Sequence, residues 1–175
     1  MDLVILIGLQ ASGKTTFYRT HLAATHEHVS KDRLRHNKKP SRRQVQLIDD
    51  ALRAGRSVVV DNTNPTVADR APLIALGRAH GARISGYYFE PSVSDSLERN
   101  REREGRARVP DVAIYATRKK LAPPSYAEGF DMLYVVRIAG HGAFEVHEWT
   151  DRDDSVVLPH VPRRGPGVDN SSQNE

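Results

Sequence analysis

The chain has 175 residues, 38% of them apolar, which is enough for one domain with a full hydrophobic core. It contains no cysteine, which excludes disulfides, thiolate zinc sites and a cysteine nucleophile. No run reaches the roughly 20 apolar residues of a membrane helix, and the short apolar opening lacks the basic lead-in of a signal peptide, so we expect a cytoplasmic protein.

Apolar runs typical of buried strands alternate along the chain with segments of helical periodicity. Strands are expected at 2–8, 26–30, 57–61, 83–89 and 131–138, with 143–149 as an edge hairpin. Helices are expected from Lys14 onward and at 41–55, 64–81, 92–103 and 110–121. The alternation predicts an α/β domain over 1–150, with a parallel sheet flanked by helices. Because Pro, Gly, Asp, Asn and Ser accumulate after it, we expect 151–175 to be a poorly ordered tail.

The helix expected at 41–55 carries explicit start and stop signals. Ser41 is a candidate N-cap residue, and Gly55 is a candidate stop. Three apolar residues at helical spacing are expected to share its buried face: Val45, Ile48 and Leu52. Further along, Asn64 and Pro65 are expected to open the next helix.

A glycine-rich motif follows the first expected strand, in VILIGLQASGKTTF. Gly8, Gly13, Lys14 and Thr15 stand at the spacing G-x-x-x-x-G-K-T, between a strand and a helix, the context that this motif requires. Backbone N–H groups of such a turn point at phosphate oxygens, Lys14 would reach the β- and γ-phosphates, and the Thr15 hydroxyl would ligate Mg²⁺. We expect a bound nucleoside triphosphate, held by Gly8, Ala11, Ser12, Gly13, Lys14, Thr15 and Thr16.

Two aspartates follow expected strands, Asp32 in VSKDRLR and Asp61 in VVVDNTNP. The carboxyl ends of parallel strands face the phosphate loop, where a carboxylate can hold Mg²⁺ or accept a proton from an attacking hydroxyl. Asp61 is the candidate metal ligand beside Thr15. The alternatives are that Asp32 caps a helix or pairs with a nearby arginine, and that Asp61 is a structural anchor bonded to Thr15.

Four stretches occur in the same order and at similar spacing in the kinase domain of polynucleotide 5′-kinases: GLQASGKTTF, HVSKDRL, VVVDNTNPTVADR and RVPDVAIYATRKKLAPPSYAEGF. The chain resembles this family, which includes the animal 5′-kinase/3′-phosphatase and a phage enzyme, over roughly residues 3–138. The resemblance implies a P-loop kinase fold, with ATP as donor, Mg²⁺ as cofactor and the 5′-hydroxyl of a DNA or RNA end as acceptor.

By position, the resemblance makes Asp32 the general base that takes the proton of the 5′-hydroxyl. Arg35 matches an arginine of the phage enzyme that lies near the acceptor phosphate. Ser30 and Lys31 stand where the family usually has Asn and Arg, so we expect the acceptor contacts to differ there.

An arginine-rich segment, RNREREGRARVP at 99–110, separates two expected helices. In related small kinases such a segment is a lid that closes over the triphosphate and supplies arginines to the transferring group. The resemblance places the catalytic lid arginine here, with Arg103 and Arg106 as candidates. The alternative is an ordinary charged helix end.

The net charge of +4 is concentrated after Asp32, where 31–43 holds seven Lys and Arg and one Asp. Such a cluster suits a nucleic-acid end, although a solvated surface is the alternative. The leading hypothesis is therefore a polynucleotide 5′-kinase. Two others stay open: a P-loop kinase of a small-molecule hydroxyl on a nucleoside, sugar or antibiotic, and an ATP-dependent binding module that regulates RNA processing.

Several aromatic and histidine residues are interpreted as structural. His26 and His28 alternate along a short strand and are expected to be exposed rather than to bind metal. Trp149 is expected to pack at an edge strand, and the aromatic residues 87–89 are expected in the core.

Overall fold

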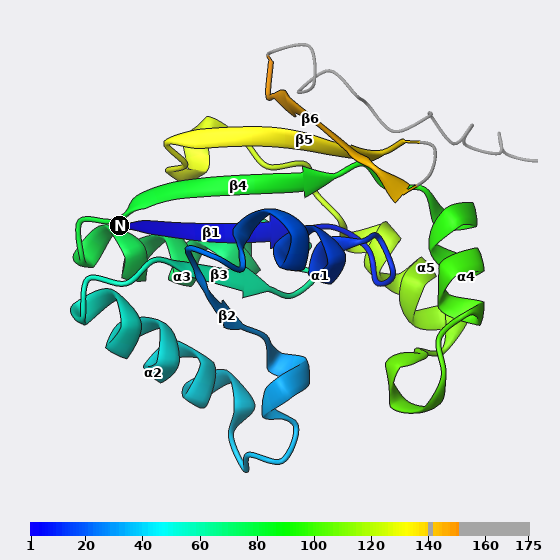
Figure 1. Ribbon diagram of the computed structural model, residues 1–175, viewed down its shortest axis with the longest axis horizontal. Helices are drawn as coiled ribbons and strands as arrows, with labels where there is room; N and C mark the ends of the chain where they lie inside the picture. Colours follow the sequence, from blue (N-terminus) through cyan, green and yellow to red (C-terminus); the bar gives the residue numbers. More distant parts are fainter. Residues whose placement is uncertain (140–141, 151–175) are drawn as a thin grey trace, which may run out of the picture.

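The computed structural model of the protein describes residues 1–139 and 142–150, so the tail expected from residue 151 lies outside it. A six-stranded sheet forms its centre, in the order β2-β3-β1-β4-β5-β6 (Figure 1). The strands are β1 (Asp2–Ile7), β2 (Glu27–Val29), β3 (Val58–Asp61), β4 (Arg83–Phe89), β5 (Met132–Ile138) and β6 (Phe144–Glu148). The pairs among β1 to β5 are parallel, whereas β6 is antiparallel to β5 and forms the expected edge hairpin.

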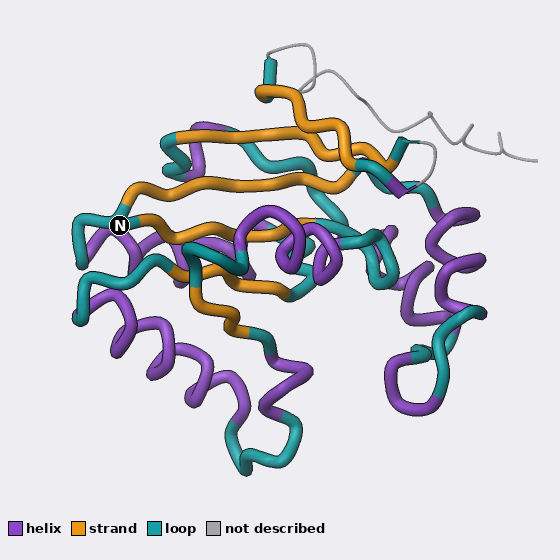
Figure 2. Tube along the Cα trace, in the orientation of Figure 1, coloured by secondary structure: helices purple, strands orange, loops and turns teal. Residues whose placement is uncertain are grey.

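Helical segments connect the strands, as the tube in Figure 2 shows. The α-helices are α1 (Lys14–Phe17), α2 (Pro40–Arg53), α3 (Val67–Ala79), α4 (Val93–Arg101) and α5 (Asp111–Lys120). The shorter helical segments are η1 (Tyr18–Leu22), η2 (Lys31–Leu34), η3 (Gly105–Ala107) and η4 (Tyr126–Glu128). The predicted α/β fold is confirmed, and within the described residues no helix is long and apolar enough to cross a membrane.

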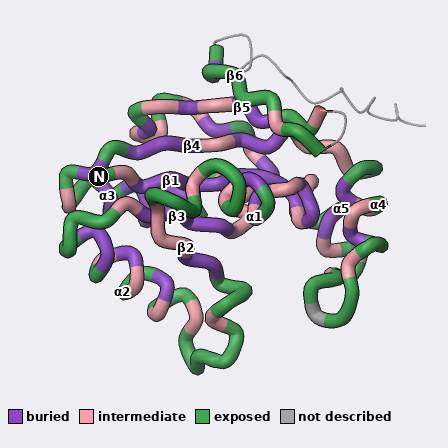
Figure 3. The backbone as a smooth tube through the Cα atoms, viewed as in Figure 1, coloured by how far each residue is buried: buried purple, intermediate pink, exposed green. Residues whose placement is uncertain are grey.

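The central strand β1 is buried on both faces (Figure 3). Its side chains at positions 3, 5 and 7 join an apolar cluster that includes residues of α2, α3 and α5. Val4 and Leu6 point to the other face, where they join a second cluster with Phe17 of α1. A continuous apolar run therefore identifies this strand, because both faces of a parallel sheet are covered.

The expected N-cap of α2 is wrong by two residues, whereas two of the three residues expected on its buried face, Ile48 and Leu52, are buried. The helix begins at Pro40 after Lys39, which makes no side-chain cap, and Ser41 lies inside it. Proline fits the first helical position because its fixed φ is already helical and its missing N–H has no partner there. Val45 is 45% exposed, since the helix turns Gln44 inward together with Ile48, Ala51 and Leu52.

The helix expected from Asn64 begins three residues later, at Val67. Thr66 is its N-cap residue and forms a capping box with Asp69, which satisfies the first backbone N–H groups better than Asn64 could. Asn64 instead has a left-handed backbone, with φ 42°. Pro72 lies inside α3, which continues through it.

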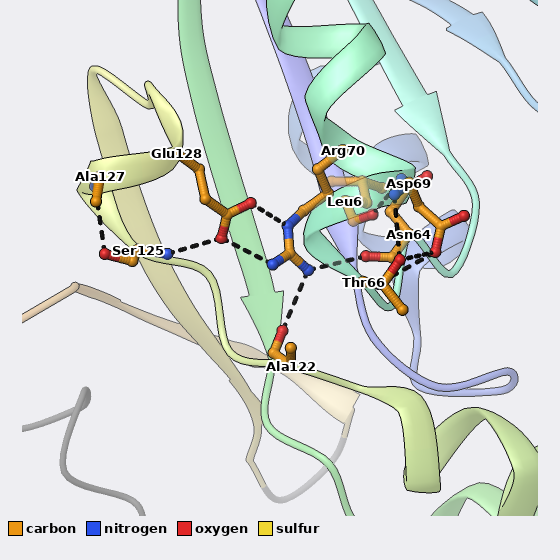
Figure 4. A network of polar contacts seen from close by, with 9 residues as sticks. All are labelled: Leu6, Asn64, Thr66, Asp69, Arg70, Ala122, Ser125, Ala127 and Glu128. Atoms are coloured by element: carbon orange, nitrogen blue, oxygen red, sulfur yellow. Dashed lines mark hydrogen bonds and ion pairs between the residues drawn. The ribbon is translucent and has the colours of Figure 1, made fainter.

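A fully buried arginine joins α3 to the connection between α5 and β5 (Figure 4). The Nε and Nη2 groups of Arg70 donate to the two carboxylate oxygens of Glu128, each at 2.7 Å. Its Nη1 group donates to the carbonyl oxygens of Asn64 and Ala122, each at 3.1 Å. The guanidinium thus donates to a carboxylate along one edge and to two backbone carbonyls along another. These hydrogen bonds hold α3, the loop between β3 and α3, and the connection between α5 and β5 together.

Candidate active site

The phosphate loop joins β1 to α1, and two of its glycines have no room for a side chain. A Cβ atom at Gly8 would lie 2.9 Å from Cβ of Phe89. Gly13 has φ 89°, and a Cβ atom there would lie 2.9 Å from Cδ1 of Ile138 and 3.2 Å from Cε1 of Phe144. The β5–β6 hairpin therefore packs directly against the loop, and only glycine fits at these positions.

Lys14 is buried and folded onto the loop from which it comes. Its Nζ donates to the Gly8 carbonyl and the Ser12 hydroxyl, both at 3.2 Å, and to the Leu9 carbonyl. Burial lowers the pKa of Lys14 from 10.5 to about 8, against the opposing effect of the Asp61 carboxylate. The site is therefore short of negative charge around this ammonium, a deficit that phosphate groups would fill.

Thr15 and Asp61 are in direct contact at the carboxyl edge of β3. The Thr15 hydroxyl donates to Oδ2 of Asp61 at 2.6 Å, and Nε2 of His28 lies 2.9 Å from the same oxygen. Burial alone would raise the pKa of Asp61, but these two hydrogen bonds and the charge of Lys14 hold it below its ordinary value. An ionised carboxylate beside a hydroxyl is the hard-oxygen pair that Mg²⁺ prefers, so the residues present fit that ion.

The described residues contain no group of three or more His, Asp or Glu side chains that could hold a metal by themselves. Mg²⁺ usually takes one or two protein ligands and the rest from phosphates and water, so the pair Thr15 and Asp61 would be enough to hold it.

The residues after Asp61 tie the phosphate loop to the rest of the site. Oδ1 of Asn62 accepts from the N–H of Lys31 at 2.9 Å, and the Thr63 carbonyl accepts from the N–H of Gly8 at 3.0 Å. Asn64 donates to the carbonyl of Leu6 at 2.8 Å. Asn64 is buried and serves as an anchor, whereas Asn62 lines the cleft described below.

Asp32 lies in η2, directly after β2. Its side chain is 80% exposed and forms an ion pair with Arg35 at 2.8 Å. The alternative that Asp32 is an N-cap residue is wrong, because Ser30 caps η2 by accepting from the N–H of Asp32. The pairing with Arg35 is present, and both residues still line the cleft.

The two ends of the segment between α4 and α5 are joined by hydrogen bonds between Asn100 and Val109. Nδ2 of the buried Asn100 donates to the Val109 carbonyl at 2.8 Å, and its Oδ1 accepts from the N–H of Val109 at 3.1 Å. Arg103 lies between these two residues in the chain and lines the cleft described below. The side chain of Arg106 lies outside the described part of the structure, so its candidacy stays a prediction.

One cleft of about 860 Å³ brings most of the candidates together, although Gly8 is not part of its lining. Its lining includes Ala11, Ser12, Gly13, Lys14, Thr15, Thr16, His28, Asp32, Arg33, Arg35, Asp61 and Arg103. Two segments that contribute residues to this lining, the one after β2 and the one between α4 and α5, both project downward in Figure 1. Lys38, Lys39 and Arg42 are exposed and lie outside this lining, on the loop that leads into α2 and on its first turn.

Sequence reasoning missed two residues that contact the core of the site. His28, expected to be exposed, is bonded to Asp61, with 11% of its side chain accessible. Nε of Arg99 donates to the carbonyl of Ala11 in the phosphate loop at 2.8 Å. The expectation for Trp149 is confirmed, since it is buried against Tyr88.

A protein-family model described as an AAA domain matches residues 3–124, well over half of the chain. The chain belongs to this family. Its phosphate loop, Asp61 and the whole arginine-rich segment 99–110 fall within the matched residues.

The curated relatives of this AAA-domain chain support the resemblance to polynucleotide kinases. The bifunctional polynucleotide phosphatase/kinase of Schizosaccharomyces pombe is 26% identical over 133 residues, which cover 74% of this chain and 32% of that protein. A putative bifunctional polynucleotide phosphatase/kinase of Acanthamoeba polyphaga mimivirus is 27% identical over 142 residues, covering 77% and 33%. The chain thus spans about a third of the length of these relatives.

A solved gluconokinase from Sinorhizobium meliloti 1021 has a similar fold. The TM-score is 0.57 and the sequence identity 20%, over 79% of this chain and 83% of that one. This likeness confirms the P-loop kinase architecture that the sequence predicts.

Proposed function

We propose that this protein transfers the γ-phosphate of ATP to the 5′-hydroxyl of a DNA or RNA end. The observation that carries the proposal is that one cleft is lined by Lys14 and Thr15 on the phosphate loop and by the Asp32–Arg35 pair across from them. The names of the two curated relatives support a polynucleotide acceptor.

The donor half of the cleft would bind the triphosphate. Lys14 would place its charge on the β- and γ-phosphates, and Arg103 would neutralise charge on the transferring group, where preorganised cations act most strongly. Thr15 and Asp61 would hold Mg²⁺, which when bound neutralises phosphate charge. Exclusion of water by the segment that carries Arg103 would protect ATP from hydrolysis.

The acceptor half would activate the hydroxyl. Asp32 would take the proton of the 5′-hydroxyl while that oxygen forms a bond to the γ-phosphorus. The bond from this phosphorus to the bridging oxygen breaks at the same time, and ADP leaves. Arg35 would hold the Asp32 carboxylate in place through their ion pair and would contact the phosphate of the acceptor nucleotide.

A kinase of a small-molecule hydroxyl is the second candidate. The exposed cations Lys38, Lys39 and Arg42 lie outside the lining of the cleft, so the cleft itself would serve a nucleoside or a sugar equally well. The gluconokinase fold is consistent with this candidate.

A screen with γ-labelled ATP tests the proposal. We expect label on 5′-hydroxyl oligonucleotides and not on nucleosides, sugars or antibiotics. Asp32→Asn should bind ATP normally and lose about 10²–10⁴ in transfer rate, because the amide keeps the shape and loses the proton acceptor. Transfer only to a small molecule would favour the second candidate, and nucleotide hydrolysis without any acceptor would favour the regulatory module.

Salt dependence separates a polynucleotide from a small acceptor. Each neutralised phosphate of a single strand contributes a slope of roughly −0.7 to log K against log salt. The double variant Lys38→Glu, Lys39→Glu should flatten this slope and raise KM for the oligonucleotide, with KM for ATP unchanged. The control is Lys119→Glu, Lys120→Glu on α5, which makes the same charge change at exposed residues outside the cleft lining.

A further inference from the structure

Four side chains form a continuous line of polar contacts from the acceptor side of the cleft to the phosphate loop. Nη1 of Arg33 lies 3.3 Å from Nδ1 of His28, and Nε2 of His28 lies 2.9 Å from Oδ2 of Asp61. The same Oδ2 accepts from the Thr15 hydroxyl at 2.6 Å. The line crosses η2, β2, β3 and α1, so it joins four separate elements.

The chemistry of the two neighbours determines which ring nitrogen of His28 carries the proton. A carboxylate only accepts, so Nε2 must donate to Asp61, and a guanidinium only donates, so Nδ1 must accept from Arg33. Of the two tautomers of the imidazole, the one with its proton on Nε2 satisfies both contacts.

The imidazole of His28 is also held in its plane. The ring of Tyr18 stacks on it at a centroid distance of 4.2 Å and an angle of 14°. The Tyr18 hydroxyl donates to the His26 carbonyl at 3.1 Å, which fixes the tyrosine to the beginning of β2. With 11% of the His28 side chain accessible, the ring has no room to turn.

Within residues 1–139 and 142–150, both hydrogen bonds to Asp61 reach Oδ2. The second oxygen, Oδ1, is therefore left for a metal ion or for a water of its shell. Partners that orient a ligating carboxylate in this way typically change metal affinity by about 10–100-fold when they are removed.

We propose that His28 is a positioning residue that orients Asp61 for Mg²⁺ and couples this carboxylate to Arg33 on the acceptor side. The inference rests on the proposed function for its kinetic meaning, but its first test needs only a nucleotide and the metal.

That test is calorimetric titration of ADP into the full chain, in EDTA and over a series of Mg²⁺ concentrations. His28→Ala should bind ADP like the parent in EDTA and should need about 10–100-fold more Mg²⁺ for the metal-dependent gain in affinity. His28→Gln should restore part of this gain, because its amide N–H reaches as far as Nε2. His147→Gln, at an exposed position on β6, is the matched control and should change neither quantity.

An unchanged Mg²⁺ requirement in His28→Ala overturns the proposal, and so does a loss of ADP affinity that is equal with and without Mg²⁺. The second result would make His28 a packing residue. If His28→Ala does not fold, as circular dichroism would show, His28→Gln and the next experiment decide. A failure to phosphorylate oligonucleotides leaves this titration valid, so the two proposals fail separately.

The second experiment is a long-range ¹⁵N–¹H correlation spectrum of the imidazoles in the metal-free protein, assigned with His28→Gln. The expected signature is an Nε2-protonated ring for His28, with an N–H proton that is protected from exchange. The other tautomer, with its proton on Nδ1 alone, cannot donate to Asp61 and overturns the proposed line of contacts.

Discussion

Lys14 shows how one side chain takes its properties from its surroundings. Two backbone carbonyls and a hydroxyl receive its N–H groups, but neutral oxygens compensate a buried ammonium incompletely. Burial therefore lowers its pKa to about 8, and a triphosphate would raise the pKa again by supplying negative charge.

This shift predicts a proton uptake on nucleotide binding. With the free pKa near 8, Lys14 is mostly charged at pH 7 and mostly neutral at pH 9, whereas the complex keeps the proton at both. Affinity should thus fall as the pH rises through about 8, by up to about tenfold per pH unit. Calorimetry in EDTA, in two buffers of different ionisation enthalpy, should find an uptake of nearly one proton at about pH 9 and little at about pH 7.5.

The control for this titration is Lys14→Arg, whose guanidinium stays charged throughout. Its uptake should vanish whatever its affinity. Equal proton uptake by the parent protein at both pH values would contradict a lowered pKa for Lys14.

Residues of the site differ in how far the sequence reveals them. Lys14 and Thr15 are evident because the conformation of the phosphate loop is local, and Asp61 is evident because it ends a buried strand. His28 and Arg99 are not, because each acts on a partner 33 or 88 residues away, and no short motif encodes such a pairing. An alternating histidine on a strand beside the phosphate loop was the available signal for His28.

At the scale of elements, the phosphate loop is held from three sides. Arg99 of α4 donates to the Ala11 carbonyl, and Gln10 donates to Oγ1 of Thr117 in α5 at 2.9 Å. Phe144 of β6 packs against Gly13. Ala11 has a left-handed backbone with φ 58°, a conformation that costs free energy without glycine, and the Arg99 contact stabilises it.

We expect Arg99→Ala to weaken nucleotide binding by about tenfold or more, because hydrogen bonds to charged groups contribute roughly 1.5–3 kcal/mol. Arg101→Ala, at an exposed position of the same helix, should have no effect. Fluorescence titration with a labelled ATP analogue measures both variants. Equal affinities of the parent and Arg99→Ala for the nucleotide would mean that the phosphate loop keeps its shape without the hydrogen bond from Arg99.

The prediction that Val45 lies on the buried face of α2 was wrong because of a contact made outside the helix. Periodicity alone cannot tell a helix face that covers the sheet from one turned by a single residue. Gln44 faces inward because its Oε1 accepts from Asn62 at 3.0 Å, a contact across 18 residues that favours a polar residue in an otherwise apolar face.

For the molecule as a whole, the Arg70–Glu128 pair connects two stretches that carry the resemblance to polynucleotide kinases, VVVDNTNPTVADR and PPSYAEGF. A backbone hydrogen bond from Ala122 to Pro65, at 2.8 Å, joins the same segments. The sequence identifies both stretches as distinctive but gives no reason for them. The structure shows that the two stretches contact each other through these bonds, so part of each stretch has a structural role.

Glu128→Gln should destabilise the protein by about 3–5 kcal/mol, because it leaves the fully buried Arg70 without a counter-charge. Urea denaturation followed by the fluorescence of the buried Trp149, the single tryptophan of the chain, measures the change. Glu27→Gln removes the exposed partner of Arg56 and should cost less than about 1 kcal/mol. Similar losses in the two variants would show that the buried pair adds nothing beyond a surface one.

The contacts that hold the phosphate loop have a consequence for the synthesis of the protein. The loop precedes its partners Arg99, Thr117 and Phe144 along the chain, so it is synthesised before all three of them. Contacts so distant along the chain form late in folding. A nascent chain that stops before β6 therefore carries the complete glycine-rich motif without the contact from Phe144, and we expect it to bind nucleotide more weakly than the finished domain.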